Sequence, residues 1–193
     1  MSRRRTIGLL VVGVVLLGAA IVTRGVGFTA RTKAWPLEER LMRGARHWAT
    51  PSAIRNASNP VSASSEALRA GMEHWADHCA ICHGNDGGGD VSIGRSLYPR
   101  APDMRVAPTQ SMTDGELFYV IERGLPFTGM PAWSTGTPDG ERSSWELVTF
   151  IRHLPKLTEQ ELKEMESLNP QSPAEAKRKR DIDDFLSGKK IIR

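Results

Sequence analysis

The chain has 193 residues, of which 39% are hydrophobic, and glycine and proline are frequent. This length allows one domain with additional segments, since single domains most often contain about 100–150 residues. A chain with only two cysteines has no disulfide framework. The net charge of +4 does not indicate nucleic-acid binding, because the basic residues flank an apolar segment and no nucleic-acid recognition motif accompanies them.

The first segment, residues 1–24, is expected to anchor the chain in a membrane. Its uncharged run from Thr6 to Thr23 would span about 27 Å as a helix, close to the thickness of the hydrocarbon layer. Three arginines at positions 3–5 precede the run, and the positive-inside tendency keeps that end in the cytoplasm. We therefore predict a single-pass anchor in a bacterial inner membrane, with the following residues in the periplasm.

A cleaved signal peptide is the alternative interpretation of the same segment. Gly18 and Ala20 offer small residues around a processing site. The apolar run is longer than the 7–15 residues typical of a signal peptide, which favours the anchor. Both interpretations place the remainder of the chain outside the cytoplasm.

The second segment, residues 25–63, is expected to be a juxtamembrane segment with an amphipathic helix and a linker. Four residues after Trp35-Pro36 recur at helical spacing, with arginines elsewhere on the helix: Leu37, Leu41, Ala45 and Trp48. This helix either packs on the rest of the protein or on a partner, or lies on the membrane surface with tryptophan and arginine at the headgroups. The stretch from Asn56 to Ser65 is predicted to be a loop.

The third segment, residues 64–155, contains three predicted helices and no predicted strand. The first runs from about Ser64, a favourable N-cap, to His78. The second begins with a capping box at residues 113–116 and ends at Gly124, and the third begins with a similar pattern at residues 143–146 and ends at Pro155. Between the first two, glycines and prolines at residues 84–102 predict an irregular loop that can enclose a flat cofactor.

The last segment, residues 156–193, is predicted to be a charged helical tail. A capping box at residues 158–161 begins one helix, and Ser172-Pro173 begins another that ends near Gly188. The second helix carries a basic run at residues 177–180, which is expected to be a solvated helix face.

The sequence Cys79-Ala80-Ile81-Cys82-His83 carries the chemistry of the third segment. Two thiols at this spacing meet the two vinyl groups of one porphyrin, and the histidine that follows is carried beneath the iron. A thioredoxin-like pair would need a βαβ pattern, and structural zinc would need two further ligands. Because neither is visible, we predict one covalent haem c, with His83 as an axial ligand.

The other axial ligand is predicted to be Met130, which lies between Gly129 and Pro131 in a segment whose irregular backbone can hold a thioether at the iron. Core packing is the usual role of a methionine, and Met72 and Met165 fit it. Other candidates for the ligand are loop methionines and, in a bis-histidine haem, three histidines: Met104, Met112, His74, His78 and His153.

These residues resemble class I c-type cytochromes over Ser64 to Pro155. Gly71 and Trp75 precede the haem motif at the family's spacing, and Met130 matches its distal ligand. The resemblance implies an all-α fold of about three core helices around the covalent haem, in which Gly71 permits a close helix crossing and Phe150 packs on Trp75.

The resemblance also implies supporting roles for residues around the haem. The carbonyl of Pro99 or Pro102 would accept a hydrogen bond from the proximal histidine. Trp133, with Phe127, would shield the distal edge. Arg105 or Arg100 would pair with a haem propionate.

The function implied is electron transfer on the periplasmic side, between a quinol-oxidising donor and an oxidase, a reductase or a photosynthetic reaction centre. Partners would be a membrane redox complex or other cytochromes, without a small-molecule substrate or nucleic acid. A fixed haem c subunit of a multi-subunit membrane complex is the main alternative. An enzyme or gas sensor, in which Met130 leaves the iron, is a third hypothesis.

Charge is unevenly distributed along the chain. Residues 24–63 carry +5, whereas residues 64–155 carry −5. An acidic haem domain would be steered toward a basic partner in a salt-dependent manner, unless the basic segment neutralises it internally.

Overall fold

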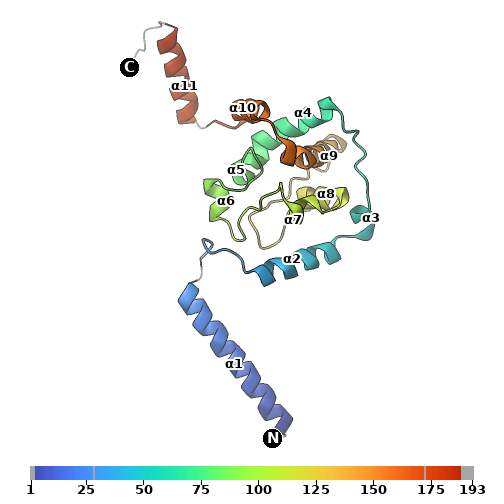
Figure 1. Ribbon diagram of the computed structural model, residues 1–193, viewed down its shortest axis with the longest axis vertical. Helices are drawn as coiled ribbons and strands as arrows, with labels where there is room; N and C mark the ends of the chain where they lie inside the picture. Colours follow the sequence, from blue (N-terminus) through green and yellow to red (C-terminus); the bar gives the residue numbers. More distant parts are fainter. Residues whose placement is uncertain (1–2, 28, 172, 188–193) are drawn as a thin grey trace.

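The computed structural model describes residues 3–27, 29–171 and 173–187, and within these ranges the protein is helical without strands (Figure 1). The predicted all-α class is confirmed. The N-terminal helices are α1 (Arg3–Val26), α2 (Pro36–Ala49) and α3 (Ser52–Arg55). The central helices are α4 (Ser65–His74), the π-turn η1 (Trp75–Cys79), α5 (Ala80–His83), α6 (Ser92–Ser96), α7 (Ala107–Gln110), α8 (Asp114–Arg123) and α9 (Pro138–His153). The 3-10 turn η2 (Leu154–Lys156), α10 (Glu159–Leu168) and α11 (Pro173–Leu186) follow.

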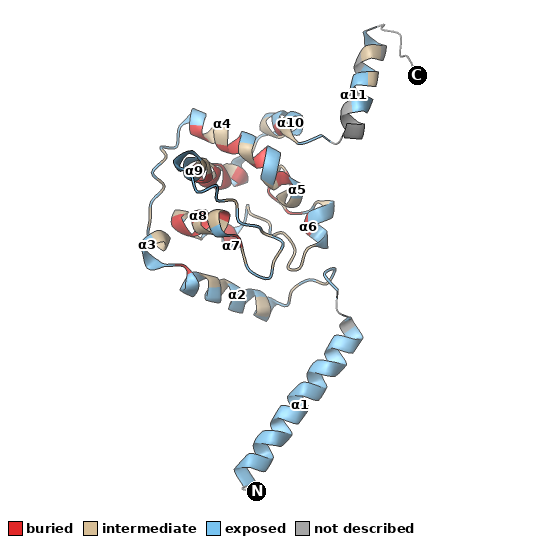
Figure 2. Ribbon diagram, turned by 180° about the vertical axis from the view of Figure 1, so that it is seen from behind, coloured by how far each residue is buried: buried red, intermediate tan, exposed pale blue. Residues whose placement is uncertain are grey.

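Helix α1 stands apart from the other helices and is exposed over Arg3–Gly25 (Figures 1 and 2). Within Arg3–Gly25 an 18-residue window reaches a mean hydropathy of 2.6, and the helix is long and apolar enough to cross a membrane. A signal sequence has the same character. The structure is therefore consistent with the predicted anchor and with its alternative.

The core forms where α4 crosses α9. Trp75 and Phe150 are fully buried there, with ring centroids 5.7 Å apart. A Cβ atom on Gly71 would lie only 2.3 Å from the carbonyl oxygen of Glu146, so the two backbones approach more closely than a side chain at this position allows. The expected roles of Gly71 and Phe150 at the crossing agree with this packing.

Three of the predicted helix starts have the expected capping bonds, at Ser64, Thr113 and Thr158. The hydroxyl of Ser64 accepts a hydrogen bond from the amide of Ala67 at 3.1 Å. At α8, Thr113 accepts from the amide of Glu116 at 3.1 Å, while the Glu116 carboxylate accepts from the amide of Thr113 at 2.8 Å. Each bond satisfies an amide that the first turn of a helix leaves without a backbone partner.

The start of the third core helix differs from the prediction. Helix α9 begins at Pro138, because Thr137 accepts a hydrogen bond from the amide of Gly140 at 3.2 Å and proline suits the first helical turn. The pattern at residues 143–146 therefore lies inside the helix. Ser144 is buried there and donates to the carboxylate of Glu122 at 2.6 Å.

The predicted boundary at residue 155 cuts through the hydrophobic core. Met165 of α10 is completely buried in the same cluster as Trp75 and Phe150. His153 and Glu161 are joined across the boundary, with Nε2 and Oε1 2.8 Å apart. We therefore place α10 with the helical core of residues 64–155, whereas the predicted start and end of the last helix, Ser172 and Gly188, lie outside the described residues.

The segment predicted as a linker wraps around the core. Ile54, Ala57 and Val61 pack against the core cluster, and the side-chain amide of Asn59 donates to the backbone oxygen of Trp145 at 2.9 Å. Residues 54–61 therefore pack as part of the same helical core.

Candidate haem site

The haem motif lies at the end of a helix that bends. Helix α4 passes through the π-turn η1 into α5, so Cys79, Cys82 and His83 follow directly from the helix that crosses α9. Such π-turns are frequent at functional sites. The helix ends at Gly84, whose φ of 73° favours glycine, and the indole of Trp75 donates to the Gly84 oxygen at 3.0 Å. The buried core therefore fixes the end that carries His83.

The two thiols are free and uncharged. Burial, with a smaller effect of the neighbouring thiol, raises the pKa of Cys79 to about 12, and burial also raises the pKa of Cys82. Both sulfurs are therefore protonated at neutral pH. Ile81, which lies between them in the motif, is exposed.

His83 has a ring nitrogen without a partner. Its Nδ1 atom is buried and makes no hydrogen bond of standard geometry. Burial lowers the pKa of His83, against a smaller opposing effect from the backbone of Pro102. The neutral ring is the form that binds metals. Of the two candidate prolines, Pro102 is the one whose backbone acts on His83, whereas Pro99 follows a cis peptide bond.

The glycine-rich loop folds back on the motif. The amide of Gly89 donates to the oxygen of His83 at 2.7 Å, and the amide of Ala101 donates to the oxygen of Gly94 at 3.1 Å. A Cβ atom on Gly94 would lie 2.2 Å from the oxygen of Cys82, so the backbones are in direct contact. The loop that leads to Pro102 is thereby held against the haem motif.

Met130 lies in a loop that its own hydrogen bonds close. Its oxygen accepts from the amide of Leu125 at 3.0 Å, and its amide donates to the hydroxyl of Thr128 at 3.1 Å. A Cβ atom on Gly129 would lie 2.6 Å from the side chain of Leu97, which places this loop against the loop after α6. The half-buried Met130 is therefore held in a defined backbone conformation.

The two aromatic residues near Met130 differ in position. Trp133 is half-buried, and its ring lies 5.4 Å from the ring of His78 in an edge-to-face contact. Its amide donates to the oxygen of Ile121 at 3.0 Å. Phe127, in contrast, is 96% exposed with a φ of 60°. Trp133 therefore packs on its surroundings, whereas the side chain of Phe127 is exposed.

The other candidate ligands have different surroundings. Met72 and Met165 are buried in the core, as expected. Met104 and Met112 are partly buried against it. Among the histidines, His74 and His78 contact each other through their rings, and His153 binds Glu161.

The two arginines considered for a propionate have opposite environments. Arg105 is engaged by two carboxylates, with Asp86 at 2.7 Å and Asp103 at 2.8 Å. Arg100 donates through Nη2 to the backbone oxygen of Arg31 at 2.9 Å, and its Nε atom is buried without a partner. Arg100 therefore offers an unpaired buried donor, whereas Arg105 is paired with two carboxylates.

Two contacts at this site were not predicted from the sequence. Leu97 meets Gly129, and His78 meets Trp133, so the segment that carries Met130 touches both the loop after α6 and the helix of the haem motif. Neither Leu97 nor His78 belongs to a motif. Only the fold shows that they connect the two halves of the site.

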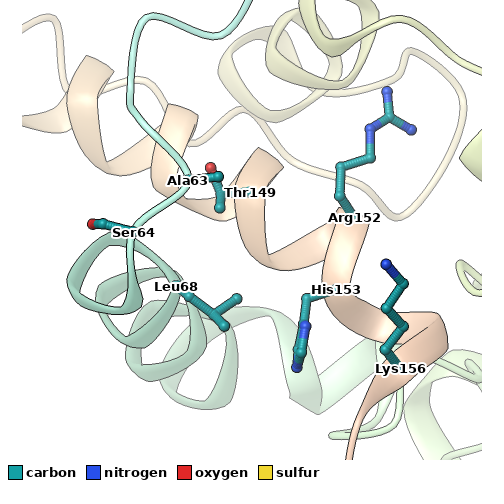
Figure 3. Close-up of a pocket in the computed structure, with 7 residues that line it drawn as sticks. All are labelled: Ala63, Ser64, Leu68, Thr149, Arg152, His153 and Lys156. Atoms are coloured by element: carbon teal, nitrogen blue, oxygen red, sulfur yellow. The ribbon is translucent and has the colours of Figure 1, made fainter.

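A shallow surface pocket lies elsewhere, between the start of α4 and the end of α9 (Figure 3). It is lined by Ala63, Ser64, Leu68, Thr149, Arg152, His153 and Lys156. Arg152 binds Asp114 and His153 binds Glu161, so two of its basic groups are already paired. Of the residues considered as haem ligands, His153 lines this pocket, where it is paired with Glu161.

The residues present fit a covalently attached haem. The two thiols are protonated, His83 has a buried ring nitrogen that lacks a partner, and Arg100 has a buried donor that lacks one. The loop of Met130 contacts the segments that flank the haem motif.

Comparison with known proteins identifies a family for the central part of the chain. Residues 66–151 match the family model described as cytochrome C oxidase, cbb3-type, subunit III. The match begins in α4 and ends in α9, so it contains the haem motif and Met130. A search of curated proteins found no match.

Proposed function

Because residues 66–151 form a class I c-type cytochrome domain that binds covalent haem c and transfers electrons, we propose that the chain is a membrane-anchored electron-transfer protein. His83 and Met130 are the axial ligands in this proposal. The haem domain lies on the periplasmic side and passes electrons from a quinol-oxidising donor to an oxidase, a reductase or a photosynthetic reaction centre.

One observation carries the ligand assignment. The segment that holds Met130 is fixed at two points, through Gly129 against Leu97 and through Trp133 against His78. The second contact reaches the helix that ends in His83. Among the described residues, Met104 is bonded instead to the loop after the haem motif, where its amide donates to the oxygen of Gly87 at 2.8 Å, and the sulfur of Met112 accepts from Arg46 of α2.

Each residue has a separate task in holding the group. Cys79 and Cys82 supply the thiols for the covalent bonds, and the end of α5 fixes His83 through the packing of Trp75. The backbone of Pro102 acts to raise the pKa of His83, and in this proposal its carbonyl accepts the hydrogen of Nδ1, the atom that lacks a partner of standard geometry. When bound, a haem with histidine and methionine ligands exchanges one electron at a potential that methionine raises.

The ligand set is tested by replacing Met130 with alanine in the full chain. We expect loss of the thioether-to-iron charge-transfer band and a lower midpoint potential. Met104→Ala and Met112→Ala are matched controls that should keep both. If the band survives in Met130→Ala, another residue is the ligand.

A fixed subunit of a larger complex is the second candidate. It is supported by the description of the matched family, which names a subunit of an oxidase. Mild solubilisation of native membranes followed by affinity purification separates the two candidates. A free carrier elutes alone, whereas a fixed subunit elutes with stoichiometric partners that carry their own cofactors.

The membrane anchor and its orientation need a separate test. Carbonate extraction should leave the protein in the membrane, and protease added to intact spheroplasts should digest the haem domain. N-terminal sequencing of the purified protein distinguishes an anchor from a cleaved signal peptide, because only an anchored protein retains α1.

A further inference from the structure

Helix α2 is amphipathic, yet its apolar side faces away from the protein. Leu37, Leu41 and Trp48 are 64%, 62% and 84% exposed. At 3.6 residues per turn these three positions fall within a sector of about 40°. No residue of α2 is buried. The helix therefore presents one continuous apolar stripe that the described part of the chain does not cover.

The haem domain holds α2 by polar contacts. Tyr98 donates its hydroxyl to the carboxylate of Glu38 at 2.7 Å, and His47 lies 2.5 Å from the carboxylate of Glu116. Arg46 donates to the sulfur of Met112 at 3.4 Å. An amphipathic helix that served only to pack on the domain would turn its apolar side inward. In this protein, the polar contacts fix the helix while the apolar side stays outward.

The position of α2 in the chain identifies what covers this stripe. Only residues 27–35 separate it from α1, and nine residues reach at most about 30 Å. In both views α2 forms the side of the haem domain nearest α1 (Figures 1 and 2). If α1 spans a bilayer, α2 is therefore confined close to the membrane surface.

The composition of the helix suits such a surface. Trp35, 60% exposed, precedes it and Trp48 lies near its end, and tryptophan favours the boundary between headgroups and acyl chains. Arg40 is exposed beside the stripe, within a segment of net charge +5. A cationic amphipathic helix of this kind lies in the plane of the interface with its apolar side in the lipid.

We propose that α2 is an interfacial helix whose Leu37, Leu41 and Trp48 insert into the lipid bilayer and hold the haem domain in one orientation on the membrane. The inference rests on the proposed membrane anchor. The contacts of Tyr98 and Glu116 with α2 transmit the orientation, because they join the helix to the loop near the haem motif and to α8. The haem then faces partners in the membrane at a fixed angle instead of tumbling on a tether.

The test uses the full-length holoprotein in lipid nanodiscs of phosphatidylcholine and phosphatidylglycerol. Spin labels are placed one at a time through Leu37→Cys, Leu41→Cys and Trp48→Cys, since the native cysteines are bonded to haem. Glu39→Cys, on the opposite side of α2, and Ser167→Cys, on α10, are matched controls. Accessibility to oxygen and to a water-soluble nickel complex reports the depth of each label.

We expect the stripe labels to be accessible to oxygen and protected from nickel, and both controls to be accessible to nickel. Nickel-accessible stripe labels in a protein that resists carbonate extraction would overturn the inference and leave the anchor standing. Release of the protein from the membrane by carbonate would overturn both the inference about α2 and the proposed membrane anchor. Stripe labels protected from oxygen and nickel alike would indicate a second copy of the chain, and would also overturn the inference.

A second measurement follows the orientation of the haem itself. The double variant Leu41→Glu, Trp48→Glu should lose the linear dichroism of the haem bands in oriented membranes, while α1 keeps the protein in the bilayer. These side chains are exposed in the domain, so thermal unfolding in detergent should match the wild type. Unchanged dichroism in a folded double variant would contradict an orienting role of α2.

Discussion

Substitution of Gly71 by alanine tests the helix crossing on which the haem site is built. The added Cβ atom would lie 2.3 Å from the oxygen of Glu146 and 2.9 Å from the Cβ atom of Phe150. A contact of 3.4 Å would require α4 and α9 to separate by about 1.1 Å at this point. The obstacle includes the backbone of α9, so a change of rotamer does not relieve it.

The magnitude follows from two opposing effects. Overpacking in a core costs about 1–3 kcal/mol, and a backbone obstacle places Gly71→Ala at the upper end of that range. Alanine gains about 1 kcal/mol over glycine from helix propensity. The free energy of unfolding should therefore fall by about 2 kcal/mol, which corresponds to a fall of roughly 10 °C in Tm for a domain of this size.

Thermal unfolding of the detergent-solubilised holoprotein, followed at the Soret band and by far-ultraviolet circular dichroism, measures this change. Gly44→Ala is the matched control, because Gly44 lies within α2 and a Cβ atom there would have no neighbour within 4 Å. Its Tm should stay the same or rise slightly. A Gly71→Ala protein that unfolds at or above the wild-type temperature would refute the close crossing of α4 and α9.

Three further outcomes are expected. Burial acts to raise the pKa of Glu116, but its hydrogen bonds and neighbouring cations outweigh burial and lower it. The stabilisation from Glu116 is thus present above the ordinary carboxyl pKa and lost as the pH falls through the lowered value. As the pH is lowered, the free energy of unfolding should therefore decrease less steeply in Glu116→Gln than in the wild type. An unchanged slope would contradict this. Met165→Ala should lower the free energy of unfolding in urea by about 2–5 kcal/mol if α10 belongs to the domain, and by much less if α10 is a tail. Arg100→Gln should lower the midpoint potential in a redox titration, since loss of a nearby positive charge favours the oxidised iron, whereas Arg105→Gln should change it less; equal shifts would contradict the assignment.

Three of the helix starts and the haem motif were predicted correctly from the sequence, because they depend on residues that are close together in the chain. Ser64 and Thr113 begin their helices because the capping bond lies within one turn, and a turn is visible in the sequence. The haem motif is local in the same sense. The family resemblance supplied the pairing of Trp75 with Phe150, which no local pattern contains.

Other features depend on contacts between distant residues, and these were missed. The pattern at residues 143–146 resembles a helix start, but Thr137 begins the helix earlier and Ser144 becomes a buried partner of Glu122. The boundary predicted at residue 155 assigned α10 to a tail although Met165 was expected to be buried, and only the structure shows that Met165 packs in the same core as Trp75. Both errors arise because an amphipathic pattern shows that a helix has an apolar side but not which other part of the protein packs against that side.

Helix α2 shows the same limit with a functional consequence. The sequence pattern is compatible with packing on the protein or on a partner and with lying on the membrane, and we predicted one or the other. Tyr98 and Glu116 hold the polar side, while Leu41 and Trp48 leave the apolar side free, so one helix can satisfy both. A haem domain joined to the anchor only by a flexible linker would take many orientations relative to the membrane. A helix that binds the domain with its polar side and the bilayer with its apolar side holds the domain in one orientation. The rate of electron transfer to a membrane partner should then depend on α2, even though α2 contributes no ligand to the iron.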